Sequence, residues 1–333
     1  MLHFISLFGI FIFSPMPALS WNQAGHILVG EIAYELVSLE TKNKIDDLIL
    51  PVFEYKINKV QKYIQDRVPK FSEFAILSIL PDRLSRLKLD KYFDWFNAAV
   101  PQNMERFSYV NHYINSPYNK DSCVNPKIQN APYVKDFLME LIASFANLHS
   151  SELTKSTTLI FVSHLVADYH QPLHVSGRMD FNCKYDRGGS KFCASPANKK
   201  GKCPGKKNLH YIFDSLFLGN DDDIKGAIKK VKEKYPLSHF QKEQVCDLSL
   251  ESWIEESTKH APFIYSTTEG ELLSSEYKNE AKEILAERLA FASYRLAIML
   301  ENIFEGDKSF CDGFTQNPTC FDSHDINDLG CSN

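Results

Sequence analysis

Apolar residues recur at helical spacing along most of this chain, whereas the alternation typical of strands hardly occurs. Helices are predicted over Gln23–Val37 and over Thr41–Leu50, where Pro51 would close the second one. An apolar segment from Lys70 to Leu80 is broken by Pro81, and residues 90–130 have no clean period, which indicates a loop with short irregular elements. Further helices are predicted over Tyr133–Leu148, Leu153–Tyr169, a short segment at His210, and Leu248–Tyr265.

Thr268 and Glu271 are spaced as a capping box, which predicts the start of a last helical stretch that ends at Phe304. No repeat and no Gly/Pro/Ser-rich linker divides the chain. The pattern therefore predicts an all-α, multi-helix fold in a single domain over residues 21–305, followed by a short cysteine-containing tail over residues 306–333.

The first twenty residues have the pattern of a secretory signal. Residues 2–13 are almost wholly apolar, and Ala18-Leu19-Ser20 is a small-x-small cleavage site. About a dozen apolar residues are too few to span a bilayer. We therefore expect a signal peptide over residues 1–20, a secreted product (extracellular or periplasmic) that begins at Trp21, and no stable membrane association.

The eight cysteines all follow residue 20, and none has C-x-x-C spacing. An even number in an exported chain favours disulfides over a zinc knuckle. Their clustering predicts that one set staples the loop from Cys183 to Cys203 and that another ties down the tail. The spacing does not determine the pairing.

Composition narrows the function only slightly. The chain has 333 residues, of which 44% are apolar and 24% charged, so it can bury a sizeable core. Its formal net charge of −5 argues against a protein that coats nucleic acid through its own field. An enzyme whose metal ions supply the positive charge is not excluded.

The stretch from Ser163 to His174 carries the most informative chemistry. His164 and Asp168 are four residues apart within an apolar run, so both side chains project from one buried face of a helix. Pro172 cannot continue that helix, so the chain should break near Gln171 and turn His174 to another angle. One such pair could be a core histidine bonded to an aspartate. The same spacing recurs at His210 and Asp214, which favours metal binding.

Other residues of the ligand type stand in similar contexts: His26 begins the first helix, Asp82 ends an apolar segment, and His112 lies in Asn-His-Tyr-Ile-Asn. Together with the two pairs and His174 they make five histidines and three aspartates. Imidazole and carboxylate without thiolate suit catalytic zinc, with positions left for water and substrate. The set is too large for one ion.

Five motifs in this order resemble the S1/P1 nucleases, zinc enzymes related to bacterial phospholipase C: Trp-Asn-x-x-Gly-His from Trp21, Pro-Asp at Asp82 in place of Ala-Asp, His-Tyr-Ile-Asn from His112, His-x-x-x-Asp-x-x-x-Gln-Pro-Leu-His from His164, and Asn-Leu-His-x-x-x-Asp ending at Asp214. Tyr294-Arg295-Leu296-Ala297 also resembles the last helix of that family. The resemblance implies an all-α phospholipase C/P1 nuclease-like fold that holds three zinc ions.

Position by position, the resemblance implies that Asp82, His112, His164 and Asp168 hold one ion. The amino group and carbonyl of Trp21, with His26, would hold a second ion that Asp168 bridges to the first. His174, His210 and Asp214 would hold the third. A free α-amino group has a pKa near 8, so a metal can displace its proton at neutral pH. Removal of the signal peptide would then also complete the site.

The implied reaction is hydrolysis of single-stranded DNA and RNA, and of nucleotide 3′-phosphates, by a zinc-activated water that Asp82 orients as the catalytic residue. The products would carry 5′-phosphates. Tyr113 would stack on a base, Asn115 stands where the family has an acidic residue, and Arg86 would replace a basic residue absent at Ser85. Tyr113 and Asn115 could instead simply pack or cap a turn.

Lysines crowd the segment before His210 and could steer a polyanion, although such a run is more often a solvated loop. His170 lies beside the motif but off its spacing, and we interpret it as an ordinary histidine. A phospholipase C remains the alternative enzyme, although that branch resembles His-x-x-x-Glu at the last pair, where this chain has Asp214. A non-catalytic secreted metal-binding or adhesive protein is the alternative from another class. We expect a monomer whose partners are nucleic acid and nucleotides.

Overall fold

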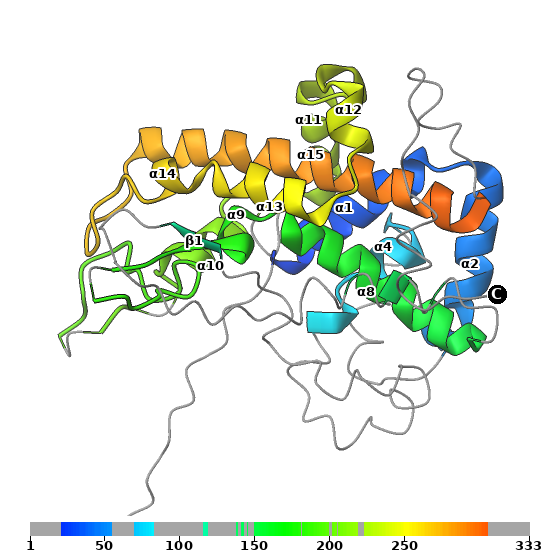
Figure 1. Ribbon diagram of the computed structural model, residues 1–333, viewed down its shortest axis with the longest axis horizontal. Coiled ribbons are helices and arrows are strands. Elements are labelled where there is room, and N and C mark those ends of the chain that lie inside the picture. The colour runs from blue at the N-terminus through cyan, green and yellow to red at the C-terminus, as the bar shows by residue number, and fades with distance from the viewer. Residues whose placement is uncertain are drawn as a thin grey trace, which may run out of the picture.

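The computed structural model describes residues 21–54, 70–82, 116–118, 138, 141, 142, 145, 150–180, 182–199, 202–204, 206–218 and 223–305. Helices dominate these residues (Figure 1), which confirms the all-α prediction. The helices are α1 (Gln23–Leu36), α2 (Leu39–Glu54), α4 (Glu73–Leu77), α8 (Glu152–Tyr169), α9 (Pro172–Val175), α10 (Leu209–Ser215), α11 (Ile224–Lys234), α12 (Lys242–Cys246), α13 (Leu250–Thr258), α14 (Ala261–Ile264) and α15 (Ser275–Glu305), with a 3-10 turn η5 (Leu237–His239). Two short strands, β1 (Ser116–Tyr118) and β2 (Ser176–Arg178), pair in parallel.

Helix α1 begins where the sequence predicts and packs against α15, α4 and α11. Asn22 caps it, because the Asn22 side chain accepts a 3.0 Å hydrogen bond from Gly25 N. Gly30 lets α4 approach closely, since a Cβ there would lie 2.9 Å from Ala75 Cα. This close contact fixes the position of α1, which also packs against α8.

Helix α8 runs through the middle of the core. Ser151 caps its start, where the hydroxyl accepts a 3.1 Å hydrogen bond from Thr154 N, and every residue from Ser156 to Tyr169 is buried. A helix buried on all sides is surrounded by other elements, and α8 contacts α1, α2, α13 and α15. In Figure 1 it lies alongside the long α15, which spans most of the molecule. Polar side chains on α8 therefore point into protein.

Three predicted boundaries were wrong, and each error concerns helix ends. α2 does not stop at Pro51 but continues to Glu54, because a proline in the last turn removes only one backbone hydrogen bond. The predicted helix from 248 to 265 is two helices, α13 and α14, and Pro262 lies in the first turn of α14, where a missing N–H costs nothing.

The capping box at Thr268 and Glu271 is also not formed. Glu271 N donates instead to Thr268 O across a 3.2 Å turn, and α15 starts at Ser275. There the Ser274 hydroxyl accepts a 3.1 Å hydrogen bond from Tyr277 N. α11 was not predicted at all, although its buried residues Ile224, Ala227, Ile228 and Val231 have helical spacing.

A disulfide joins Cys193 to Cys203, which confirms a staple within the predicted loop, and Cys183 is also disulfide-bonded. Within the described ranges, no helix is long and apolar enough to cross a membrane. The signal segment 1–20 and the tail 306–333 lie outside the described residues. Of the helix predicted over 133–148, four residues are described, and they are helical and buried: Leu138, Leu141, Ile142 and Phe145.

Candidate metal centre

Helix α8 places His164 and Asp168 on the same side, as their spacing predicts. Both side chains are fully buried, and His164 Nε2 lies 3.2 Å from Asp168 Oδ2. His26 approaches from α1, with its Nε2 3.5 Å from Asp168 Oδ1. The rings of His26 and His164 stack with centroids 3.9 Å apart. These residues form a first group whose ligand atoms all lie within 4.8 Å of one another.

The chain breaks after α8 as predicted. Gln171 caps the short helix α9 with Pro172 in its first turn, and this corner turns His174 back toward α8. His174 Nδ1 then lies 3.6 Å from Asp168 Oδ1, while its Nε2 lies 3.5 Å from Asp214 Oδ1. The imidazole of His174 thus stands between two carboxylates that are 46 residues apart in sequence.

Helix α10 supplies the remaining pair. Asn208 caps it through a 2.8 Å hydrogen bond from Tyr211 N, and His210 and Asp214 then share one face. His210 Nε2 lies 3.5 Å from Asp214 Oδ2, and the His174 and His210 ring centroids are 5.0 Å apart. These three residues form a second group within the same 4.8 Å limit. Asp168 connects the two groups, since its Oδ1 faces both His26 and His174.

Comparison with known proteins gives the family of this chain. The family model described as S1/P1 Nuclease matches residues 21–305. This chain belongs to the S1/P1 nuclease family. Among curated proteins, Endonuclease 1 of Arabidopsis thaliana is 23% identical, with 91% of this chain and 93% of that protein covered. Endonuclease 2 of the same plant is 28% identical over 58% of this chain and 71% of its own length.

Backbone carbonyls fix the histidines of this nuclease. His164 Nδ1 donates to Ser78 O over 2.8 Å, and His210 Nδ1 donates to Gly188 O over 2.7 Å. A carbonyl can only accept, so each Nδ1 carries a proton and each Nε2 is directed at its group, where it presents a lone pair when the imidazole is neutral. This is the arrangement that metal-binding histidines use.

The two groups fit divalent zinc by distance and by chemistry. Two ligands about 2.0–2.2 Å from one tetrahedral zinc lie roughly 3.3–3.6 Å apart. The nitrogen–oxygen distances within and between the groups run from 3.2 to 3.9 Å, a range that includes that spacing. Imidazole with carboxylate is also the donor set that zinc accepts.

Electrostatics favours a cation at the same place. Burial raises the pKa of Asp214 well above its ordinary value; the hydrogen bond from Gln171 opposes this, while the charges of Asp168 and Asp82 raise it further. Burial lowers the pKa of His164, but the neighbouring Asp168 outweighs burial and the net pKa is raised. Several carboxylates packed without positive charge repel one another, and a bound cation removes that cost.

Of the other predicted ligands, the structure describes Asp82 and Trp21 but not His112. Asp82 is buried with its Oδ1 3.9 Å from His164 Nε2, beside the first group. Trp21 is buried and donates from its indole to Ala167 O over 2.8 Å, while the next residue, Asn22, donates from its backbone to Asp214 O over 3.1 Å. The described chain thus begins between α8 and α10. The predicted ligand His112 and the predicted substrate residues Tyr113, Asn115 and Arg86 lie outside the described residues.

Sequence reasoning missed the residues that position the ligands. Gln171 donates from Nε2 to Asp214 Oδ1 over 2.6 Å. Gly188 has a φ of +57°, and a Cβ there would lie 2.1 Å from Leu173 O, so only glycine lets this backbone reach His210. The motif Gln-Pro-Leu-His and the Gly188-Gly189 pair were visible, but spacing alone did not say what they contact.

Proposed function

We propose that this nuclease is a three-zinc phosphodiesterase that hydrolyses single-stranded DNA and RNA to products with 5′-phosphates and also removes 3′-phosphates from nucleotides. The observation that carries the proposal is the pair of buried His/His/Asp groups joined through Asp168. The described ligand atoms of both groups are imidazole nitrogens and carboxylate oxygens, which is the donor set of catalytic zinc sites.

The family resemblance supplies the assignment of ligands to ions, and it divides the first group between two ions. His26 with the amine and carbonyl of Trp21, and His164 with Asp82 and His112, would hold two ions that share Asp168. His174, His210 and Asp214 would hold the third. Zinc, when bound, supplies positive charge that polarises a phosphoryl oxygen and acidifies a water molecule.

The protein's own residues supply orientation. Asp82, at the edge of the first group, would accept a hydrogen bond from the attacking water and align it with phosphorus. The fixed tautomers of His164 and His210 keep the ligand lone pairs in place before substrate arrives. Tyr113 would stack on an exposed base, Asn115 would bond the base edge, and Arg86 would contact phosphate. Stacking on an unpaired base favours single strands over duplex.

The amine of Trp21 exists only after the first twenty residues are removed, so we also propose that the active form is secreted. The main test uses this mature form loaded with zinc on single-stranded DNA, RNA and phosphatidylcholine in parallel. Cleavage of the nucleic acids to 5′-phosphate ends supports the proposal. Hydrolysis of phosphatidylcholine alone would replace it with a phospholipase C, and zinc binding without hydrolysis would replace it with a metal-binding protein.

A variant links activity to the geometry. Asp168→Asn should lower the bound zinc in both groups, because this carboxylate faces His26, His164 and His174. Asp47→Asn, an exposed aspartate on α2, is the matched control and should keep full zinc and activity. An Asp168→Asn protein with three zinc ions and wild-type turnover would contradict the assignment.

A further inference from the structure

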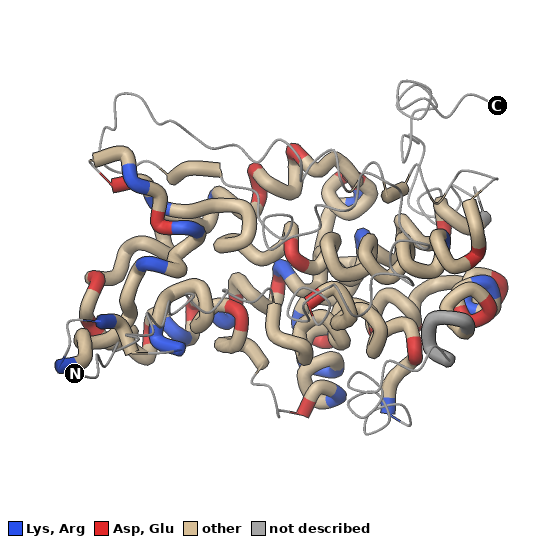
Figure 2. The backbone as a smooth tube through the Cα atoms, turned by 90° about the horizontal axis from the view of Figure 1, so that it is seen from below, with Lys and Arg blue, Asp and Glu red and all other residues tan. Residues whose placement is uncertain are grey.

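The loop between β2 and α10 carries an unusual concentration of positive charge. Residues 182–207 contain eight Lys or Arg and one acidic residue, Asp186, in a chain whose net charge is −5. Asp186 is buried. Seven of the eight cations are described, and all seven are exposed: Lys184, Arg187, Lys191, Lys199, Lys202, Lys206 and Lys207. The loop lies at the left end of the molecule in Figure 1, and Figure 2 shows Lys and Arg at that end interspersed with Asp and Glu.

Within the described part of the loop, none of these cations forms a salt bridge with an acidic side chain. Lys191 donates to the carbonyl of Tyr185 over 3.1 Å, and Lys206 lies 5.6 Å from the centre of the Tyr211 ring. Three of the five lysines of α11 differ, because they form ion pairs with acidic side chains: Lys229 with Glu233, Lys232 with Glu35, and Lys234 with Glu283. The positive charge of the loop is therefore available to an external anion, whereas that of α11 is largely balanced.

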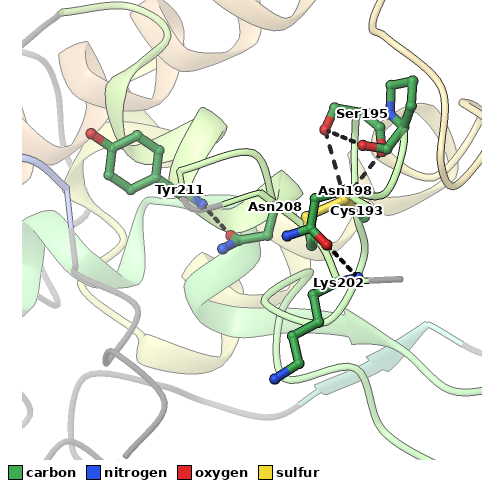
Figure 3. Close-up of a disulfide and its surroundings, with 8 residues drawn as sticks. Cys193, Ser195, Asn198, Lys202, Asn208 and Tyr211 are labelled. Atoms are coloured by element: carbon green, nitrogen blue, oxygen red, sulfur yellow. Dashed lines mark hydrogen bonds between the residues drawn. A yellow bond between two sulfur atoms is a disulfide. The ribbon is translucent and has the colours of Figure 1, made fainter. Parts of the chain in front are cut away.

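The loop is held in a defined shape. The Cys193–Cys203 disulfide closes its outer half, and Asn198 Oδ1 accepts a 3.1 Å hydrogen bond from Lys202 N inside that ring (Figure 3). Cys193 pairs with Asn208 in an antiparallel bridge, and Ala194 N donates to Lys207 O over 2.9 Å. The lysines thus project from a fixed frame, which lowers the entropy lost when they bind.

The same loop is built onto the second group. The Gly188 carbonyl of the loop accepts a hydrogen bond from His210 Nδ1, and the Gly189 carbonyl accepts one from His210 N over 3.4 Å. Asn208, which bridges to Cys193, is also the cap of α10, the helix that carries His210 and Asp214. The cationic loop and the candidate metal group are therefore one continuous piece of structure.

We propose that the seven described cations of this loop form a docking surface for the phosphate backbone of single-stranded nucleic acid beyond the nucleotides at the candidate metal centre. This inference rests on the proposed function. The surface would bind the strand through its phosphate charges and independently of its base sequence. The enzyme would therefore prefer long strands over short ones. An anionic membrane could also attract lysines, but continuity with a candidate phosphodiester site favours nucleic acid.

The test compares two triple variants with equal loss of charge. Lys199, Lys202 and Lys207 are changed to Gln in the loop variant, and Lys225, Lys229 and Lys230, all exposed on α11, are changed to Gln in the control. Binding of a phosphorothioate single strand is measured by fluorescence anisotropy against salt concentration, using zinc-loaded protein. Hydrolysis of a dinucleotide is measured in parallel.

If each loop lysine contacts one phosphate, the slope of log affinity against log salt should fall by about 2, since each contact contributes roughly 0.7 for a single strand. Affinity at 0.1 M salt should fall by up to about 100-fold. The control should keep the wild-type slope, and dinucleotide hydrolysis should be unchanged in both variants.

Equal slopes in the two variants, with dinucleotide cleavage intact, would overturn the docking surface and leave the proposed function standing. If the zinc-loaded wild-type protein does not cleave the dinucleotide, the proposed function itself is overturned. Loop-dependent binding to phosphatidylserine vesicles, together with unchanged binding to the single strand, would also overturn the proposal and make the loop a membrane contact.

Discussion

Replacing Arg295 tests a buried network of ion pairs that the spacing of apolar residues does not predict. Arg295 is fully buried on α15 and donates to Glu256 through both terminal nitrogens, each over 2.7 Å. It also donates to His170 Nε2 over 2.9 Å and to Gln244 O over 3.2 Å from Nε. Arg288, also buried, donates to the same Glu256 carboxylate over 2.8 Å.

Arg295→Met keeps most of the side-chain volume against Trp253 but removes the charge and every donor. Breaking a buried ion pair by removing one partner costs about 3–5 kcal/mol, because the other partner stays desolvated. Arg288 still neutralises Glu256, so we expect the free energy of unfolding to fall by about 3 kcal/mol, the lower end of this range. Lys259→Met is the control, since the Lys259–Glu255 pair on the neighbouring surface is more than half exposed and should contribute at most about 1 kcal/mol.

Urea unfolding of zinc-loaded protein, followed by tryptophan fluorescence, measures both variants. Burial alone would raise the pKa of Glu256, but the hydrogen bonds and charges of Arg295 and Arg288 bring the net pKa below its usual range. A depressed carboxyl pKa stabilises the fold above the unfolded value, near 4.3, and this contribution is lost as pH falls below it. Arg295→Met should therefore lose less stability than wild type on acidification through this window. If Arg295→Met lowers the free energy of unfolding at neutral pH by no more than Lys259→Met does, the reasoning is refuted.

Four further results are expected. Gln171→Met should weaken zinc binding by about 10–100-fold, seen by competition with a chelator, because the Gln171 amide positions Asp214. Chelation should lower the melting temperature, and zinc at about 100 times its Kd should restore roughly 2.7 kcal/mol while magnesium should not. Burial and the charge of Arg288 lower the pKa of His260 to about 4, so the stability difference between wild type and His260→Asn should shift in favour of the variant as pH falls from 6.5 to 4. One residue added before Trp21 should reduce bound zinc by one ion; unchanged zinc content would exclude the amine as a ligand.

The two candidate metal-binding groups were accessible to sequence analysis because the spacing of their His and Asp residues is local. His164 with Asp168, and His210 with Asp214, each repeat at one helical turn, so their common face follows from helix geometry alone. Pro172 marks the corner for a similar local reason. What brings the pairs together is tertiary packing of α1, α8 and α10, and for that the ordered family motifs were needed.

Helix ends and supporting residues were harder to predict, since they depend on small energies or distant contacts. Whether Pro51 ends α2 depends on one hydrogen bond, which packing of the helix can outweigh. Gly188 contacts His210 across 22 residues of loop, and no periodicity records that contact. Arg288 and Arg295 look like surface residues by type, and only the position of Glu256 explains why they are buried.

His164 within α8 and His170 at the C-cap of α8 show how neighbouring side chains decide the role of a histidine. His164 and His170 are both fully buried, and each Nδ1 donates to a backbone carbonyl, Ser78 O for the first and Val166 O for the second. The Nε2 of His164 faces carboxylates, which raise its pKa and leave room for a cation. The Nε2 of His170 accepts a hydrogen bond from Arg295, and burial together with both arginines lowers the pKa of His170 far below the ordinary value. A lone pair already directed at a guanidinium cannot bind zinc, so His170 can hold the corner that orients His174 but cannot join the metal centre.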